Sequence, residues 1–144
     1  MALTKHSAYV AAIASTLTTE LNSLGTAANS SASAEIDNST DLNLYHDLTL
    51  TIATQGVART AGATVVVYLI PALDDTNFDA VNETTAEVAA VFSLDASTTA
   101  RQATRRDVPI PPGKFKYFIR NVTGQTLAAS GNLLEYRAHN VETL

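Results

Sequence analysis

Short stretches in which apolar and polar residues alternate limit the folds open to this chain more than any other feature. Residues 44–54 read LYHDLTLTIAT, and every second side chain from Leu44 to Ile52 would lie on one face of a half-buried strand. Residues 64–70, TVVVYLI, are apolar on both faces. This second pattern predicts a central strand that is covered on both sides, either by its own domain or by a neighbouring copy.

Further stretches predict strands that turn residues separate about every ten positions. They lie at residues 87–96, 100–110, 115–120 and 133–139. Pro111 to Gly113 form a rigid corner, and residues 115–139 read as a β-meander with TLAAS, 126–130, as its middle strand. About eight short strands of this kind predict an all-β fold, an antiparallel jelly-roll-like β-sandwich.

The N-terminal residues 1–30 are predicted to form a short helix or an arm, and residues 31–144 the β-sandwich, within a single globular domain. Apolar residues from Val10 to Leu24 recur at steps of three and four, as in a helix, and Gly25 stands where a C-terminal cap would lie. The many β-branched threonines favour an extended arm instead. The sequence leaves both alternatives open.

The composition excludes several classes of protein. The 144 residues include no cysteine, so the chain has no disulfides and no cysteine zinc site. No stretch approaches the roughly 20 apolar residues of a membrane span, and the N-terminus lacks the apolar run of a signal peptide. We therefore expect a soluble protein that is made in a cytoplasm and has no membrane partner.

The net charge of −5 is unevenly distributed along the chain. Residues 1–100 carry 11 acidic and 2 basic side chains, a net charge of −9, whereas residues 101–144 carry 7 basic and 3 acidic, a net charge of +4. This split would let one part of the surface attract another copy or an acidic partner. The alternative is that the charges interleave in the folded chain and cancel.

Residues that could catalyse a reaction or bind a metal show no recognisable pattern. His6, His46 and His139 are scattered. His46 falls on an apolar face and is predicted to be a hydrogen-bonded histidine of the core or of an interface. HNVE at 139–142 reads as a solvated tail. The acidic loop at 74–83 lacks the EF-hand pattern. No phosphate-binding loop or nucleophile elbow is present. We predict no enzymatic activity, no cofactor and no metal.

The stretch from residue 101 to 120 concentrates arginine, lysine and aromatic residues. Arginine and aromatic enrichment is typical of interfaces between proteins. Phe118 falls on the charged face of its strand, so it is either covered or stands in water. Binders of single-stranded nucleic acid use similar residues, but the acidic chain opposes a polyanion. The predicted protein interface consists of Arg101, Arg105, Arg106, Lys116, Phe118 and Arg120.

Several longer segments resemble a small virion protein of tailed bacteriophages, in the family of capsid decoration (cement) proteins and related head proteins. The densest match lies in residues 107–139, and the first ten residues and the acidic loop fit loosely. The segments are LTTELNSLG, SSASAEIDNSTDLNLYHDLTLTIAT, VVVYLIPALDDTNF and VPIPPGKFKYFIRNVTGQTLAASGNLLEYRAHN.

The resemblance implies a jelly-roll-like sandwich that self-associates as a homotrimer on the outer surface of the virion, made in the host cytoplasm, where it bridges subunits of the major capsid protein. The sandwich would open at Ile36–Asn38, turn its corner at Pro111–Phe115, and hold its turns with Asn121, Gly124, Gly131 and Asn132. One departure is DDTN at 74–77, where the family leads us to expect a glycine after the first aspartate.

Two other functions stay open. A carbohydrate-binding module would use Tyr45, Tyr68, Tyr136 and Asn77 as a groove, although the chain has no tryptophan for stacking. A tail or head-to-tail connector component would share the fold and differ only in its place in the virion.

Overall fold

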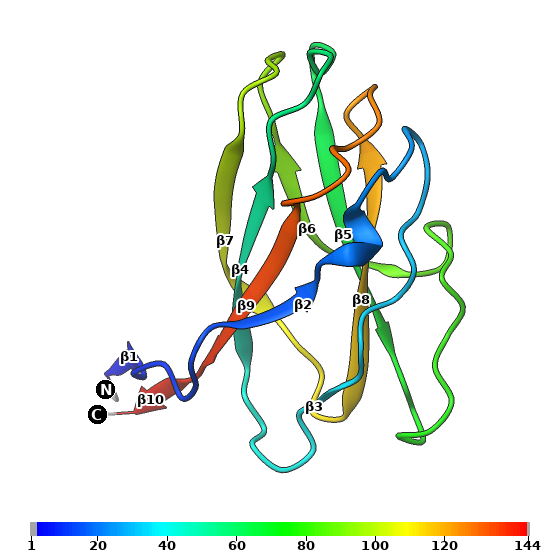
Figure 1. Cartoon of the computed structure of the whole chain (residues 1–144). Coiled ribbons are helices and arrows are strands. Elements are labelled where there is room, and N and C mark those ends of the chain that lie inside the picture. The colour runs from blue at the N-terminus through cyan, green and yellow to red at the C-terminus, as the bar shows by residue number, and fades with distance from the viewer. Residues whose placement is uncertain (1–2, 144) are drawn as a thin grey trace.

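The computed structural model of the chain describes residues 3–143, which form two four-stranded antiparallel sheets and a third sheet of two strands (Figure 1). Within this range the helical content is one 3₁₀ turn, and no helix is long and apolar enough to cross a membrane. The elements are β1 (Thr4–His6), β2 (Ala14–Leu17), η1 (Thr19–Leu21), β3 (Ile36–Asp37), β4 (Tyr45–Ile52), β5 (Thr64–Pro71), β6 (Glu87–Ser93), β7 (Arg101–Pro109), β8 (Lys114–Val122), β9 (Leu133–His139) and β10 (Val141–Thr143).

The strands pair in a nested order. β1 pairs with β10, β2 with β9, β3 with β8, β4 with β7 and β5 with β6, all antiparallel. The chain is therefore one two-stranded ribbon that starts at β1 and β10 and closes at the connection between β5 and β6. The ribbon coils on itself, because β4 also pairs with β9 and β5 with β8. This coiling gives the sheet orders β2-β9-β4-β7 and β3-β8-β5-β6.

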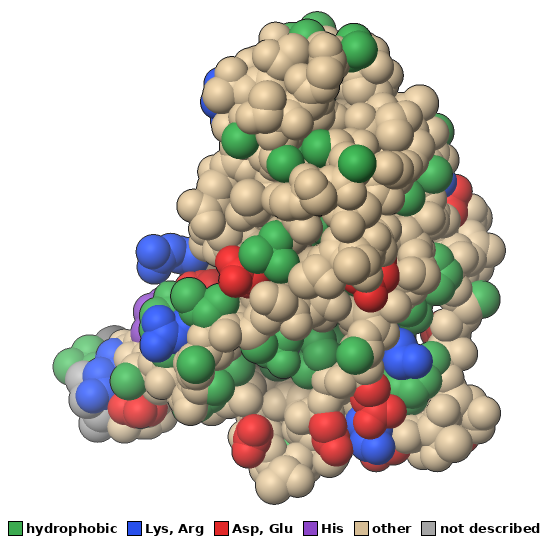
Figure 2. All heavy atoms as spheres, viewed as in Figure 1, with side chains coloured by type: hydrophobic (Ala, Val, Ile, Leu, Met, Phe, Trp, Pro, Cys, Tyr) green, Lys and Arg blue, Asp and Glu red, His purple; other side chains and the backbone are tan. Residues whose placement is uncertain are grey.

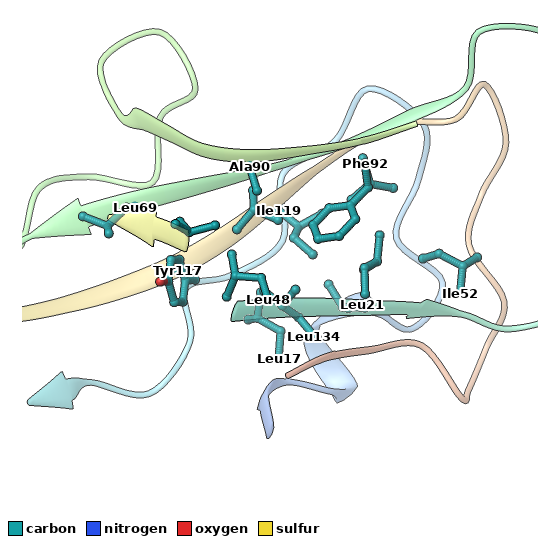
Figure 3. Close-up of a cluster of buried hydrophobic side chains, with 14 of the residues drawn as sticks. Leu17, Leu21, Leu48, Ile52, Leu69, Ala90, Phe92, Tyr117, Ile119 and Leu134 are labelled. Carbon is teal, nitrogen blue, oxygen red and sulfur yellow. The ribbon is translucent and has the colours of Figure 1, made fainter. Parts of the chain in front are cut away.

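The two larger sheets share one apolar core (Figure 3). Leu48 and Leu134 from the first sheet meet Val67, Tyr117 and Ile119 from the second, and all five are fully buried. Each such side chain contributes roughly 1.5–3 kcal/mol through removal of its apolar surface from water. The alternation predicted for residues 44–54 is confirmed from His46 to Ile52, where every second residue is buried, whereas Leu44 is 49% exposed. The alternation predicted for residues 115–120 is confirmed for the core face, where Phe115, Tyr117 and Ile119 are buried.

The outer face of β5 and β8 is also covered, as the apolar pattern of residues 64–70 predicted. Phe118 and Tyr68 stack with ring centroids 4.9 Å apart, and Ile70 completes this second cluster. Ala32 and Ala86 of the same chain pack against it, so the cover comes from the chain's own loops. Backbone bonds from Ser30 to Ile119 and from Ser33 to Tyr117 hold the loop before β3 in this place.

The predicted helix between residues 8 and 24 is wrong, and the extended alternative is closer to the structure. Val10 and Ile13, which would have shared a helical face with the buried Leu17, are 55% and 62% exposed. The segment is extended up to β2 and then makes the single turn η1. Threonine-rich sequence favours this backbone, and burying Leu17 and Leu21 in the common core fixes it.

The predicted meander between residues 115 and 139 is also wrong. β8 and β9 are consecutive, but they lie in different sheets, and residues 126–130 form a loop that crosses between the sheets. Leu127 in this loop is buried, which explains why its sequence resembled a strand. The amide group of Asn121 donates to the carbonyls of Leu24, Gly25 and Gln125, so it fixes the start of the crossing.

Candidate functional site

Five of the six predicted interface residues are engaged by their own chain. Three of them are cations with close partners: the Arg101 guanidinium pairs with Asp95 at 2.6 Å, Arg105 donates to the Val91 carbonyl at 2.8 Å, and Arg120 pairs with Glu83. Lys116 Nζ lies 4.2 Å from the centre of the Phe78 ring. Phe118 has no exposed surface.

Arg106 is the exception among the six. Its side chain is exposed, has no hydrogen-bond or ion-pair partner within residues 3–143, and lines a cavity beside β1. Of the residues predicted from the basic stretch, the structure therefore leaves Arg106 most available to a partner. Phe118 does not fit the predicted role, because Tyr68 and its neighbours already bury it.

Opposite charges from the two parts of the sequence meet inside the folded chain. Arg101, Lys114 and Arg120, all from the basic C-terminal part, pair with Asp95, Glu35 and Glu83 from the acidic part. The interleaving alternative therefore describes these residues. At these three contacts, the charges of the basic and the acidic parts of the sequence neutralise each other.

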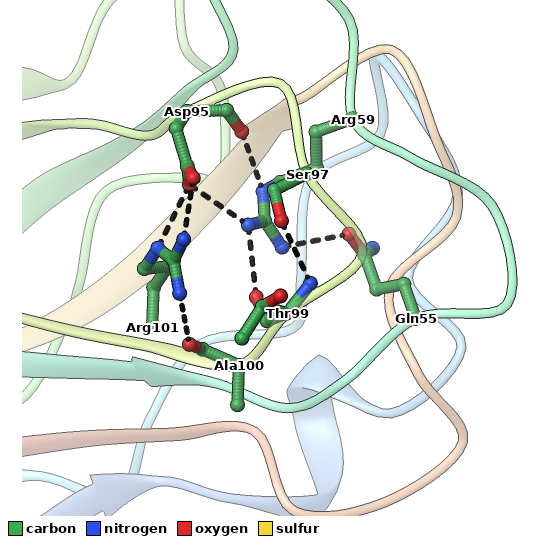
Figure 4. Close-up of polar contacts among 7 residues, drawn as sticks. All are labelled: Gln55, Arg59, Asp95, Ser97, Thr99, Ala100 and Arg101. Atoms are coloured by element: carbon green, nitrogen blue, oxygen red, sulfur yellow. Dashed lines mark hydrogen bonds and ion pairs between the residues drawn. The ribbon is translucent and has the colours of Figure 1, made fainter.

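A buried arginine organises the loops at the opposite end of the molecule from β1 and β10 (Figure 1). Figure 4 shows its contacts. The fully buried Arg59 guanidinium donates to the carbonyls of Asp95 and Thr99, to the Asp95 carboxylate and to Gln55 Oε1. Arg101 holds the same carboxylate from outside. Every partner is a loop group of the chain itself, so this network positions backbone and presents no free group for chemistry.

A cluster of histidine and aspartate side chains lies where β1 and β10 leave the larger sheets. We call the pair of strands β1 and β10 the terminal ribbon. His139 Nε2 lies 3.2 Å from Oδ1 of Asp47 and 3.2 Å from Oδ1 of Asp107. His6 Nδ1 lies 3.6 Å from Oδ1 of Asp107. β1, β4, β7 and β9 thus each contribute one side chain to a single cluster.

A bulge in β7 brings Asp107 into this cluster. His46 faces Val108 across the sheet and Leu48 faces Arg105, so two residues of β7 lie opposite Asp47. Asp107 has a left-handed backbone, φ +55°, and its N–H donates to Asp47 Oδ1 at 3.0 Å. The bulge changes the direction of the Asp107 side chain, which explains how an edge strand reaches His139.

His139 is held on several sides and is 4% exposed. Its ring stacks on Tyr45 and meets the rings of His6 and Tyr9 edge-on. Burial alone would raise the pKa of Asp47, but hydrogen bonds from the Tyr9 hydroxyl and the Asp107 amide, together with His139, lower the pKa overall. The Asp47 carboxylate is therefore ionised, and its hydrogen bond raises the pKa of Tyr9.

A cavity of about 290 Å³ opens at the cluster, and Ser7, Tyr9 and Arg106 line it beside the histidines. Ser7 Oγ donates to the Ala8 carbonyl and accepts the Asn140 N–H, so it makes no nucleophile–base pair with His139. Within residues 3–143, His6, Asp107 and His139 are the one group of three metal-ligating side chains whose donor atoms converge. Ligand binding is therefore the chemistry that this arrangement supports best.

The prediction that residues 139–142 form a solvated tail is wrong for His139. The chain continues from β9 into β10, which pairs with β1, so His139 lies between strands and not at a frayed end. Sequence spacing could not reveal the cluster, because positions 6, 47, 107 and 139 meet only through this pairing. The one local signal was an acidic residue, Asp107, just before the end of a predicted strand.

Among residues 3–143, neither the acidic loop nor the group of tyrosines predicted to line a sugar groove comes together as a site. Asp74 accepts hydrogen bonds from the backbone of Thr76 and Asn77, so its carboxylate stabilises a turn. Tyr68 is buried against Phe118 in one sheet, whereas Tyr136 stacks on His46 in the other.

No protein-family model matches the chain, and no curated protein shows significant similarity to it.

Proposed function

We propose that the chain is a non-enzymatic structural protein of a virion, a capsid decoration protein that self-associates and bridges major capsid subunits on the outer shell. Its proposed fold is the jelly-roll-like β-sandwich. The nested pairing supports this, because a two-stranded ribbon coiled into two facing sheets is the way in which eight strands form a jelly roll. The phage resemblance of the sequence supports the place in the virion.

The observation that carries the proposal is the terminal ribbon. Both of its strands are exposed at every residue, and it projects from the body of the molecule (Figure 1). An isolated two-stranded ribbon is only marginally stable in water, so it needs another surface to pack against. A projecting ribbon of this kind suits contact with a second molecule.

Exposed apolar side chains lie on and around the terminal ribbon. Large apolar residues normally avoid such exposure in groups, and grouping is typical of interaction surfaces. Figure 2 shows hydrophobic side chains on and beside the projecting part. The exposed apolar residues of this region are Leu3, Val10, Ile13, Leu44 and Val141.

Self-association is tested by measuring the molar mass of the chain by light scattering across protein concentration. We expect a species of three times the 15.2 kDa chain mass, formed reversibly. Ile13→Ser should shift the association to higher concentration, because it removes a 62% exposed apolar group beside the ribbon. Val57→Ser is the matched control, since Val57 is 60% exposed in a distant loop.

A second measurement tests the bridging role. The chain is added to capsids that lack it, and bound copies are counted after sedimentation. Saturable binding of many copies, with greater resistance of the capsid to heat, is expected because binding only the assembled shell stabilises the shell. A chain that stays monomeric and does not sediment with capsids would contradict the proposal, and binding of about a dozen copies or fewer would favour the connector alternative.

A further inference from the structure

We propose that His6, Asp107 and His139 bind one Zn²⁺ ion, and that this ion links the terminal ribbon to the body of the molecule. The inference goes beyond the structural role proposed above and does not depend on it. It rests on the side-chain geometry at the base of the ribbon.

The donor atoms are spaced as zinc ligands are. Ligands about 2.1 Å from a tetrahedral ion lie roughly 3.4 Å from one another. The two recorded separations, 3.2 Å between His139 Nε2 and Asp107 Oδ1 and 3.6 Å between His6 Nδ1 and Asp107 Oδ1, bracket this value. Two imidazoles and one carboxylate form a donor set that suits Zn²⁺ better than Mg²⁺ or Ca²⁺, which prefer oxygen alone.

The surroundings fix the buried ligand and leave one side of the site open. The rings of Tyr45 and Tyr9 hold the His139 imidazole in place. Asp47 lies 3.2 Å from Nε2, where its carboxylate would be close to the ion, and it is itself held by Tyr9 and by the Asp107 backbone. The cavity beside the cluster lets an ion reach the three side chains, and a water molecule from the cavity can then occupy its fourth coordination position. Asp47 and Asp107 together offset the charge of the cation.

The site lacks one usual feature of zinc histidines. His139 Nδ1 is buried, and no group of residues 3–143 accepts a hydrogen bond from it. Because such outer partners are worth about 10–100-fold in affinity, we expect a dissociation constant on the order of micromolar and not the much tighter binding of closed structural sites.

Zinc at this position would join parts of the fold that are otherwise loosely connected. His6 belongs to the terminal ribbon, whereas Asp107 and His139 belong to the sheet β2-β9-β4-β7. Apart from its pairing with β10, β1 meets the body through exposed contacts such as that between His6 and Asp107. An ion would therefore fix the direction in which the ribbon projects.

The first test is calorimetric titration of Zn²⁺ into the chelator-treated chain without any histidine tag. We expect one ion per chain, and binding that is weaker by about tenfold or more in His6→Gln and in Asp107→Asn. Asparagine tolerates the left-handed backbone at position 107, so the second variant removes the ligand charge without new strain. Asp41→Asn, at an exposed carboxylate outside the cluster, should bind zinc as the unaltered chain does.

The imidazole NMR signals and amide exchange give a second, independent result. The chain has only three histidines, so zinc should shift the signals of His6 and His139 and leave that of His46 in place. Exchange of the amides at residues 4–6 and 141–143 should slow when zinc is added. Absence of zinc binding, equal binding of Mg²⁺, or unchanged affinity in both variants would overturn the site and leave His139 as a hydrogen-bond partner of Asp47.

Discussion

His46 is a buried imidazole whose environment opposes its protonation. Its Nδ1 lies 3.0 Å from the Tyr117 hydroxyl, and its ring stacks on Tyr136 with centroids 4.2 Å apart. Burial and, to a smaller extent, the nearby His139 lower the pKa of His46 to about 3, although Asp47 opposes the change. The sequence-based prediction of a hydrogen-bonded core histidine is confirmed.

This environment predicts a loss of stability in acid. The unfolded chain binds a proton at His46 near pH 6.5, whereas the folded chain does so only near the folded pKa of about 3. The contribution of His46 is therefore complete above about pH 6.5 and is lost as the pH falls towards 3, by at most about 1.4 kcal/mol per pH unit. Urea denaturation at several pH values measures this slope.

The matched comparison is His46→Phe in a Tyr117→Phe background, which removes the imidazole without leaving the hydroxyl unpaired. This double variant should lose less stability between pH 6.5 and 4.5 than Tyr117→Phe alone. Equal slopes in the two proteins would mean that His46 is not the group responsible.

The backbone at Asp75 explains the departure noted in DDTN. Asp75 has φ +58°, in the left-handed region where glycine is usual. Aspartate is one of the few other residues that tolerate this region. Its Oδ1 also accepts the Lys114 N–H at 3.0 Å, which ties the acidic loop to the start of β8. The side chain thus gives a contact that glycine would lack.

Among the elements, the loops after β4 and after β6 depend on Arg59. Arg59→Met should destabilise the chain by about 2–4 kcal/mol, because buried carbonyl and amide acceptors lose their donor. Urea denaturation measures the change. Arg101→Met removes a partly exposed guanidinium from the same Asp95 and should cost less than about 1 kcal/mol. If both variants lost equal stability, the buried network would not be the support of these loops.

Arg105 of the edge strand β7 is bound by its own chain and is not free for a partner. The strand is exposed over most of its length, and exposed edges invite pairing with other chains. Arg105 extends from β7 to the Val91 carbonyl of β6 and lies over the Phe92 ring. It therefore links the two sheets across their open side, which is a role that composition alone could not distinguish from an interface.

For the whole molecule, the pairing of opposite charges within the chain sets how self-association should respond to salt. The three ion pairs of Arg101, Lys114 and Arg120 already satisfy these cations. The proposed contacts around the terminal ribbon are mainly apolar. We therefore expect the concentration at which the chain associates to change less than about threefold between about 0.05 and 0.5 M salt.

Light scattering across salt concentration checks this expectation. Strong weakening of association with salt would show that charges between copies dominate, with Arg106 as the first residue to substitute. Arg106→Gln would then identify whether the exposed guanidinium carries the effect.

The sequence by itself determined the six strands β4 to β9 and much of the composition of the core between them. Alternation placed Leu48, Leu50, Phe115, Tyr117 and Ile119 inside, and all of them are fully buried. The all-β class followed from the same local pattern, because strand periodicity depends on neighbouring residues only. The turn residues Gly124 and Gly131, which the family resemblance suggested, have φ of +78° and +81°, as glycine at a turn allows.

Only the tertiary structure decided which strands pair and which charged residues meet. β8 and β9 are neighbours in sequence yet belong to different sheets, because the chain coils as one nested ribbon. His6 and His139 come together because β1 pairs with β10, and Asp107 joins them because a bulge turns its side chain. Pairings of this kind depend on contacts between distant segments, and no local pattern of side chains encodes them.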